Sequence, residues 1–235
     1  MIYPSSSSTP TSPRTAPQQR INAIYQDIRY RICTNRHPPG TLLSEEEMAR
    51  EYSVSRSPIR RVCSMLEHEG LVEIKHGIGT LVTRIEPEQL ADVYAVRQIL
   101  AESMGPFIDL PFADDTAGFF HECADGFLAL DEGDAIGFAE INIRYYTGLT
   151  GLAGNSTLRE MQRSLFFQTS RMWLLLLPAM DWAETMKAVH DELLEIIRRI
   201  EIADPVGLAY VVRNHIFESQ QRMLQARQNG DVGKT

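Results

Sequence analysis

No long hydrophobic run occurs in this chain. The longest apolar segment, MWLLLLPAM (172–180), contains Pro178 and is much shorter than the roughly 20 residues that a helix needs to cross a bilayer. The N-terminal segment MIYPSSSSTPTSPRTAPQQ also lacks the apolar centre of a secretory signal peptide. We therefore expect a cytoplasmic protein with no membrane partner.

Cysteine is scarce as well. Cys33, Cys63 and Cys123 are odd in number and form no Cys-x-x-Cys pair, which favours a reducing compartment over a disulfide framework. We expect these three residues to be small members of the core.

The composition is that of an ordinary globular protein with two domains. Hydrophobic residues make up 43% and charged residues 23% of the chain, and 235 residues exceed the usual length of a single domain. Residues 1–17 are rich in Ser, Thr and Pro, so we expect a disordered arm there. The rest divides into a first domain (18–83), a linker (84–86), a second domain (87–228) and a flexible tail (229–235).

Charge is distributed unevenly between these parts. Residues 1–84 hold 11 Lys/Arg against 8 Asp/Glu, a net +3, whereas the remaining 151 residues hold 12 against 23, a net −11. A difference of sign between two halves indicates that they face different partners.

Three helical patterns precede residue 70. The first has isoleucines at helical spacing from Ile21 to Ile32 and ends at HPPG (37–40). The second begins at Ser44, where Ser-x-x-Glu with Glu47 forms a capping box. The third begins near 55–58 and ends at Gly70, and its inward stripe consists of Ile59, Val62, Cys63 and Leu66.

Arg56, Arg60 and Arg61 lie at the N-terminal end of the third helix, away from its apolar stripe. Two short helices joined by a tight turn form a helix-turn-helix, whose second helix enters the major groove of DNA by this end. An arginine fork can bond guanine O6 and N7 or a phosphate. Three arginines alone are more often a solvated helix face, but the element order favours DNA binding.

A hairpin follows, over residues 71–83, as in the wing of a winged helix-turn-helix. Lys75, His76 and the Gly77 backbone would lie at its tip, close to phosphates or the minor groove. The sequence GIG (77–79) lacks the third glycine and following helix of a dinucleotide site.

Several short motifs occur together in this region: Pro39-Gly40, Met48-Ala49, Val54-Ser55-Arg56-Ser57-Pro58-Ile59-Arg60, Glu69-Gly70-Leu71-Val72 and Gly77-Ile78-Gly79. This pattern resembles the N-terminal domain of the GntR family of bacterial transcription regulators. The resemblance implies that Arg56 and Arg60 contact bases and phosphates, that Ser55 and Ser57 bond phosphates, and that His76-Gly77 forms the wing contact. It also shows a departure, because many members carry a DNA-facing arginine at the position of Glu46.

Helical periodicity dominates the second domain, without convincing strands. We expect helices near 87–104, 113–131, 135–150, 156–177, 182–202 and 205–228. The segments AVRQILAE (95–102) and YYTGLTGLAGNSTL (145–158) resemble the ligand-binding FCD bundle of FadR-like GntR regulators. The predicted fold class is therefore mainly α, with a winged helix-turn-helix domain before an all-α FCD-type bundle.

Many members of that branch hold a divalent metal through an Asp and a His on one helix and a His on each of two later helices. The corresponding residues here are Asn142, Tyr146, His190 and His215. Asn142 is neutral and the Tyr146 phenol has a pKa near 10, so the anion and the third imidazole are missing. Two hypotheses stay open: zinc, nickel or manganese bound by His190, His215 and Asn142, or a metal-free pocket in which all four residues bond an organic effector.

Arg97, at the family's first-helix arginine, is a candidate for binding an effector carboxylate through a bidentate fork. An ordinary ion pair is the alternative. The apolar residues Met161, Phe166, Phe167, Met172 and Trp173 on the 156–177 helix are interpreted as core, dimer seam or pocket wall.

These patterns predict a homodimeric transcription regulator that binds a palindromic DNA operator and responds to a small organic acid. One alternative is a helical-bundle enzyme, although the second domain has no Glu-x-x-His motif and the chain has no P-loop or Gly-x-Ser-x-Gly elbow. Another is a DNA-binding protein without a ligand.

Overall fold

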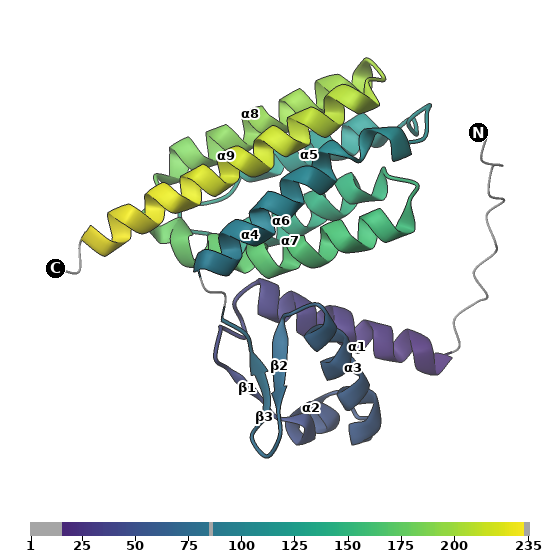
Figure 1. Cartoon of the computed structure of the whole chain (residues 1–235), viewed down its shortest axis with the longest axis vertical. Helices are drawn as coiled ribbons and strands as arrows, with labels where there is room; N and C mark the ends of the chain where they lie inside the picture. Colours follow the sequence, from purple (N-terminus) through teal and green to yellow (C-terminus); the bar gives the residue numbers. More distant parts are fainter. Residues whose placement is uncertain (1–15, 85–86, 233–235) are drawn as a thin grey trace.

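The computed structural model describes residues 16–84 and 87–232. In Figure 1 a small N-terminal domain lies below a larger bundle of helices, and the two are joined near residue 84. The N-terminal elements are α1 (Ala16–Cys33), β1 (Leu42–Leu43), α2 (Glu45–Glu51), α3 (Arg56–His68), β2 (Val72–Lys75) and β3 (Gly79–Val82).

The helix-turn-helix consists of α2 and α3, as the sequence predicts. The Ser44 side chain accepts a hydrogen bond from the backbone N–H of Glu47 at 3.3 Å, which is one half of the expected capping box. The four residues of the predicted α3 stripe are fully buried. Gly70 has φ +72°, the left-handed conformation expected at the end of this helix.

The predicted hairpin is confirmed, and it belongs to a sheet with the strand order β1-β3-β2. The sequence did not predict β1, in which Leu42 and Leu43 pair antiparallel with Leu81 and Thr80. Two residues are too few to show the alternation that marks a strand.

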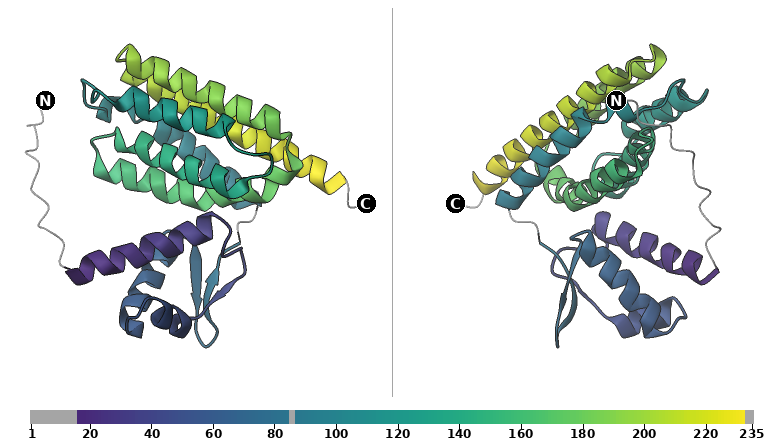
Figure 2. Two further views of the ribbon diagram at one scale, coloured as in Figure 1. Left: turned by 180° about the vertical axis from the view of Figure 1, so that it is seen from behind. Right: turned by 45° about the vertical axis from the view of Figure 1, so that its right-hand side comes forward.

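The bundle contains α4 (Pro87–Glu102), α5 (Thr116–Leu128), α6 (Ala135–Gly151), α7 (Ser156–Leu176), α8 (Trp182–Glu201) and α9 (Pro205–Val232), with 3₁₀ turns at Gly105–Phe107 and Leu177–Ala179. The six expected helices are therefore present within the described residues. The most extensive helix–helix contacts are between α4 and α9 and between α5 and α8, which lie side by side in both views of Figure 2.

Two expected boundaries need correction. Helix α1 begins at Ala16, so the last two residues of the expected arm are helical, and α9 extends to Val232, four residues into the expected tail. A single glycine such as Gly230 costs only about 1 kcal/mol in a helix and need not end it. Residues 1–15, 85–86 and 233–235, on which the rest of the arm, linker and tail predictions fall, lie outside the described residues.

The two domains touch along α1 and α7. Arg171 of α7 donates a hydrogen bond from Nη2 to Thr83 Oγ1 at 2.7 Å. The Arg29 guanidinium lies 4.0 Å from the centre of the Phe167 ring. Helix α7 therefore contributes side chains to the boundary with the N-terminal domain.

The three cysteines are free and buried, as expected for core residues. Burial raises the pKa of the Cys33 thiol to about 12. Across residues 16–84 and 87–232, no helix combines the length and the apolar character required to span a membrane.

Candidate nucleic-acid interface and effector cavity

The N-terminal end of α3 is fully accessible. Ser55 is the N-cap, with its side chain free of a capping bond, and all five residues predicted on this helix are exposed: Ser55, Arg56, Ser57, Arg60 and Arg61. A helix N-terminus carries a partial positive charge and free N–H groups, so it adds to the attraction that arginines exert on phosphate.

The hairpin tip supplies the other predicted contacts. Lys75, His76 and Gly77 are exposed, and Gly77 has φ +76° in the turn between β2 and β3. The tip and α2 lie toward the end of the domain farthest from the bundle (Figure 1). The structure thus places all eight predicted residues on accessible elements of one domain, while their contacts with DNA stay a prediction.

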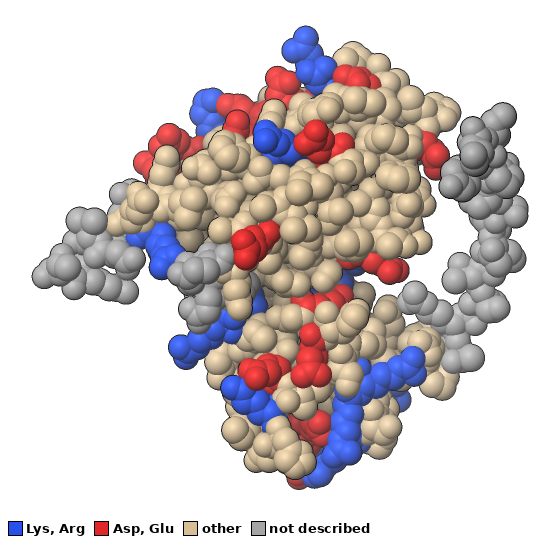
Figure 3. Space-filling view, in the orientation of Figure 1, with Lys and Arg blue, Asp and Glu red and all other residues tan. Residues whose placement is uncertain are grey.

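Acidic side chains are interleaved with these cations (Figure 3). Glu46 Oε2 lies 2.5 Å from Arg56 Nη2, and Glu45 Oε2 lies 2.9 Å from Arg60 Nε. The hydrogen bond that Arg60 Nε donates to Glu45 raises the pKa of Arg60. Sequence reasoning noted Glu46 as a departure from the family pattern but did not predict either ion pair.

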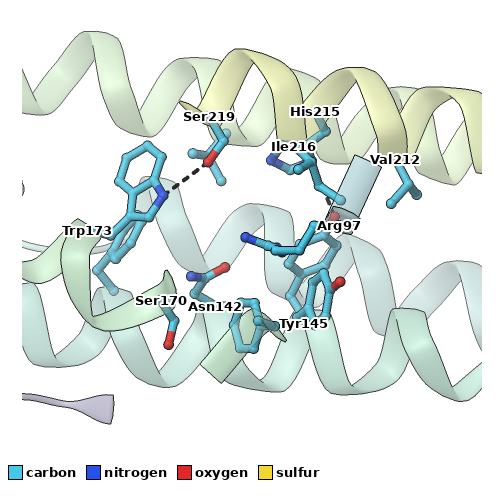
Figure 4. Close-up of a pocket in the computed structure, with 13 residues that line it drawn as sticks. Arg97, Asn142, Tyr145, Ser170, Trp173, Val212, His215, Ile216 and Ser219 are labelled. Atoms are coloured by element: carbon cyan, nitrogen blue, oxygen red, sulfur yellow. Dashed lines mark hydrogen bonds between the residues drawn. The ribbon is translucent and has the colours of Figure 1, made fainter. Parts of the chain in front are cut away.

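A cavity of about 40 Å³ lies between α4, α6, α7, α8 and α9 of the bundle. Thirteen residues line it: Arg97, Phe138, Asn142, Tyr145, Tyr146, Phe166, Ser170, Trp173, Val189, Val212, His215, Ile216 and Ser219. Figure 4 shows the Arg97 side chain reaching toward Asn142, with Trp173 and Ser219 at one end, where the indole Nε1–H donates to Ser219 Oγ at 3.0 Å.

Arg97 is a buried cation in this cavity, only 6% exposed. Its Nη1 donates to Thr169 Oγ1 at 2.7 Å, whereas Nε is buried and finds no acceptor in the described part of the chain. The guanidinium lies 5.3 Å from the Tyr146 ring centre and 5.6 Å from that of Phe166. Aromatic faces attract a cation, but among the described residues no carboxylate forms an ion pair with it.

The structure brings Asn142, Tyr146 and His215 to the same cavity as Arg97, but not His190. Val189 lines the wall instead, and the His190 Nδ1 atom lies 3.4 Å from the Asp191 carboxylate. Neighbouring residues on a helix point about 100° apart, so a position inferred from the family pattern can fall beside the cavity.

The two neighbouring tyrosines of α6, Tyr145 and Tyr146, make different contacts in the cavity. Tyr146 stacks on Phe166, with ring centres 4.1 Å apart and planes inclined by 9°. The phenolic oxygen near the imidazole belongs to Tyr145, 3.3 Å from His215 Nδ1. Burial, followed by the nearby Glu192 charge, holds the pKa of Tyr145 well above its ordinary value, so this phenol is neutral.

Glu192 is a site residue that sequence reasoning missed. Its Oε2 lies 2.5 Å from His215 Nε2, and its Oε1 accepts a hydrogen bond from Arg222 Nη2 at 2.6 Å. Burial disfavours its charge, but His215 and Arg222 together outweigh that effect and hold the pKa of Glu192 below its ordinary value. The sequence signal that could have revealed Glu192 is its position as an acidic residue on the inner face of the helix predicted over 182–202.

These residues do not fit a metal site. In residues 16–84 and 87–232 no three His, Cys, Asp or Glu side chains form a group that could hold a metal ion. His215 Nε2 lies 2.5 Å from the Glu192 carboxylate, His190 is not in the cavity wall, and Asn142 is neutral. Tight zinc sites use at least three protein ligands.

The apolar stripe of α7 has more than one role. Phe166 and Trp173 line the cavity, as expected for pocket walls. Phe167 is buried at the boundary with α1, while Met161 is 49% exposed.

A winged helix-turn-helix with an exposed, arginine-bearing second helix, followed by a helical bundle with an internal cavity, defines a helix-turn-helix transcription regulator. The chain belongs to the GntR family: the model of bacterial regulatory proteins of the gntR family matches residues 20–82, and the FCD domain model matches residues 113–218.

Similar proteins agree with this assignment, and a solved structure shares the fold. The chain is 30% identical, over 57% of its length and 81% of the relative's, to an uncharacterised HTH-type transcriptional regulator in the TAR-I ttuE-ttuC' intergenic region of Agrobacterium vitis. It is 35% identical to the gluconate operon transcriptional repressor of Bacillus subtilis over 33% of this chain and 31% of the repressor. The fold is similar to that of E. coli McbR/YncC, with a TM-score of 0.76 at 14% identity over 88% of this chain and 97% of the other.

Proposed function

We propose that this protein is a homodimeric regulator whose N-terminal domains bind a palindromic operator and whose bundle binds a small organic acid without a metal. The observation that carries the effector part is Arg97, a nearly buried cation without an ion-pairing carboxylate among the described residues. An unpaired charge is costly to bury. A ligand carboxylate offers the missing partner, because it accepts two parallel hydrogen bonds from one guanidinium.

The rest of the cavity suits such a ligand. Asn142, Ser219 and the Tyr145 phenol supply neutral polar groups near Arg97, while Phe138 and Ile216 supply apolar surface. Because the enclosed space is small, we propose a compact acid with a few non-hydrogen atoms, or a larger one that enters with movement of the walls. Because the residues around His215 do not fit a metal site, we expect the ligand to bond protein groups directly.

The exposed faces of α4 and α9 support the proposed dimer. Tyr210, Phe217 and Leu224 recur at intervals of seven residues along α9 and are 41–50% exposed, and Ile99 of α4 lines a surface groove with Phe217. This face carries few charged side chains (Figure 3). An exposed helix face with apolar side chains at this spacing is typical of an interface between subunits.

Helix α7 offers a route from ligand to DNA. Phe166 and Ser170 line the cavity, and their neighbours Phe167 and Arg171 contact Arg29 and Thr83 in the N-terminal domain. A ligand that prefers one position of α7 would therefore change the placement of the DNA-binding domains, and DNA would change ligand affinity by the same factor.

The effector proposal is tested by calorimetric titration of the metal-free full-length protein with a panel of small mono- and dicarboxylic acids. We expect at least one acid to bind wild type and the affinity to fall about 10-fold or more in Arg97→Gln, since a charge-assisted bidentate contact contributes roughly 1.5–3 kcal/mol. The ligand should return unchanged after incubation, because no enzymatic turnover is expected.

Arg198→Gln is the matched control, because Arg198 is exposed on α8 and its loss changes the net charge equally. Arg198→Gln should bind the acid as wild type does. Wild-type affinity in Arg97→Gln, or an equal loss of affinity in Arg198→Gln, would contradict the assignment of Arg97. A panel without any binder, together with wild-type affinity for operator DNA, would favour a DNA-binding protein without a ligand.

A further inference from the structure

The ion pair between α2 and the recognition helix α3 concerns DNA specificity. Glu46 and Arg56 have side chains that are 61% and 58% exposed, and they meet at 2.5 Å through Oε2 and Nη2. An ion pair so exposed contributes little to folding. Stability therefore gives little reason for this pairing.

Its neighbours in the first turn of α2 differ in their contacts. Glu45 is less exposed, at 27%, and pairs with Arg60. Glu47 is exposed, and its side chain forms no ion pair within the described residues. Glu46 is thus the carboxylate presented beside Arg56, at the end of α3 that enters the major groove in this class of fold.

The pair displays a donor and an acceptor side by side. Glu46 accepts from Arg56 Nη2, which carries two N–H groups, so the second can still form a fork with a neighbouring N–H toward the O6 and N7 acceptors of guanine, while a glutamate oxygen can accept from the N4 amino group of cytosine. In a G·C pair these groups are adjacent at the edge that faces the major groove. A carboxylate is at the same time repelled by phosphates and by guanine or thymine acceptors placed opposite it, which selects against other sequences.

We propose that Glu46 is a specificity-determining residue, which positions Arg56 on guanine and itself reads the N4 amino group of a cytosine in each operator half-site. The proposal rests on the proposed function, because it requires sequence-specific binding of DNA. It also predicts that Glu46 weakens binding to non-specific DNA, since it adds negative charge near the phosphates.

The test compares full-length wild type, Glu46→Gln and Glu47→Gln by selection from randomised double-stranded DNA, followed by titration of every single base change in the wild-type operator. We expect a cytosine whose replacement weakens wild-type binding about 5- to 150-fold, the range of one good base contact. In Glu46→Gln this discrimination should fall to about 2-fold or less, while affinity for non-specific DNA rises. Glu47→Gln removes the same charge one residue away and should keep the wild-type discrimination.

The outcomes separate the two claims. If wild type selects an operator and Glu46→Gln discriminates equally well at every position, the assignment to Glu46 is wrong while the proposed function stands. A uniform gain in affinity for all sequences in both variants would reduce Glu46 to a general electrostatic effect and likewise overturn the assignment. If wild type selects no sequence at all, the proposed function fails, and the role of Glu46 with it.

Discussion

The two domains hold their key arginines in opposite environments. Arg56 is mostly exposed and has an acidic partner, whereas Arg97 is 6% exposed and has none among the described residues. An exposed pair exchanges its partners at little cost, which suits a surface that must release its internal contacts to bind DNA. A buried cation without an anion is costly, which supports the proposal that the cavity binds an anionic ligand.

The strongest test of the exposed set is removal of Arg56 or Arg60. We expect Arg56→Ala and Arg60→Ala each to weaken operator binding about 30-fold or more in fluorescence anisotropy, because one base contact contributes roughly 1–3 kcal/mol and a dimer loses it in both half-sites. The melting temperature should stay close to that of wild type, since both side chains are exposed. Unchanged operator affinity in both variants would contradict the DNA-reading role of α3.

Glu192 provides the matching test inside the bundle. We expect Glu192→Gln to lower the free energy of unfolding by about 3 kcal/mol in urea denaturation, because it leaves His215 and Arg222 without their buried anion. A loss below about 1 kcal/mol would show that the buried Glu192 interactions contribute no more than the exposed ion pairs of the N-terminal domain. The contrast between the two domains would then be wrong.

The pH dependence of the same variant sharpens the comparison. Because the folded-state pKa of Glu192 is lowered, its contribution is fully present above the ordinary glutamate pKa and is lost as pH falls through the lowered value. Stability of wild type should therefore decline over that acidic range more steeply than stability of Glu192→Gln.

The smallest effect is expected at the hairpin tip. Lys75 is exposed, and its one ion pair within residues 16–84 and 87–232 is with Glu73 of the same strand, β2, at 3.2 Å. Lys75→Ala should weaken binding a few-fold for all sequences and reduce the dependence of log affinity on log salt by about 1 per protomer. A change in sequence preference would instead assign Lys75 to base recognition.

Local patterns made much of the fold predictable. The α3 stripe, the Ser44 cap and the left-handed Gly70 depend on residues within a few positions of one another, so periodicity and capping rules suffice. The strand β1 has only two residues, too few to show an alternating pattern. The start of the first helix and the end of the last one could not be predicted to the residue.

The site was less predictable, because it depends on contacts between distant elements. Family positions suggested a group containing Arg97, Asn142, Tyr146 and His215, and the structure places these four residues around one cavity. They could not show that the Glu192 carboxylate, 23 residues earlier in the chain, lies against His215 Nε2. Nor could they show that His190 lies outside the cavity wall. Rotation and register between packed helices decide such details, and neither is encoded in local spacing.

The two faces of α7 have a consequence for how such a regulator can change. Phe166 and Ser170 line the cavity, whereas Phe167 and Arg171 face the N-terminal domain. Substitutions on the first face can alter which compound is sensed while the connection to DNA is kept, and substitutions on the second can alter the strength of the response while the compound stays the same. A new input signal is then accessible through a few replacements on one side of a single helix.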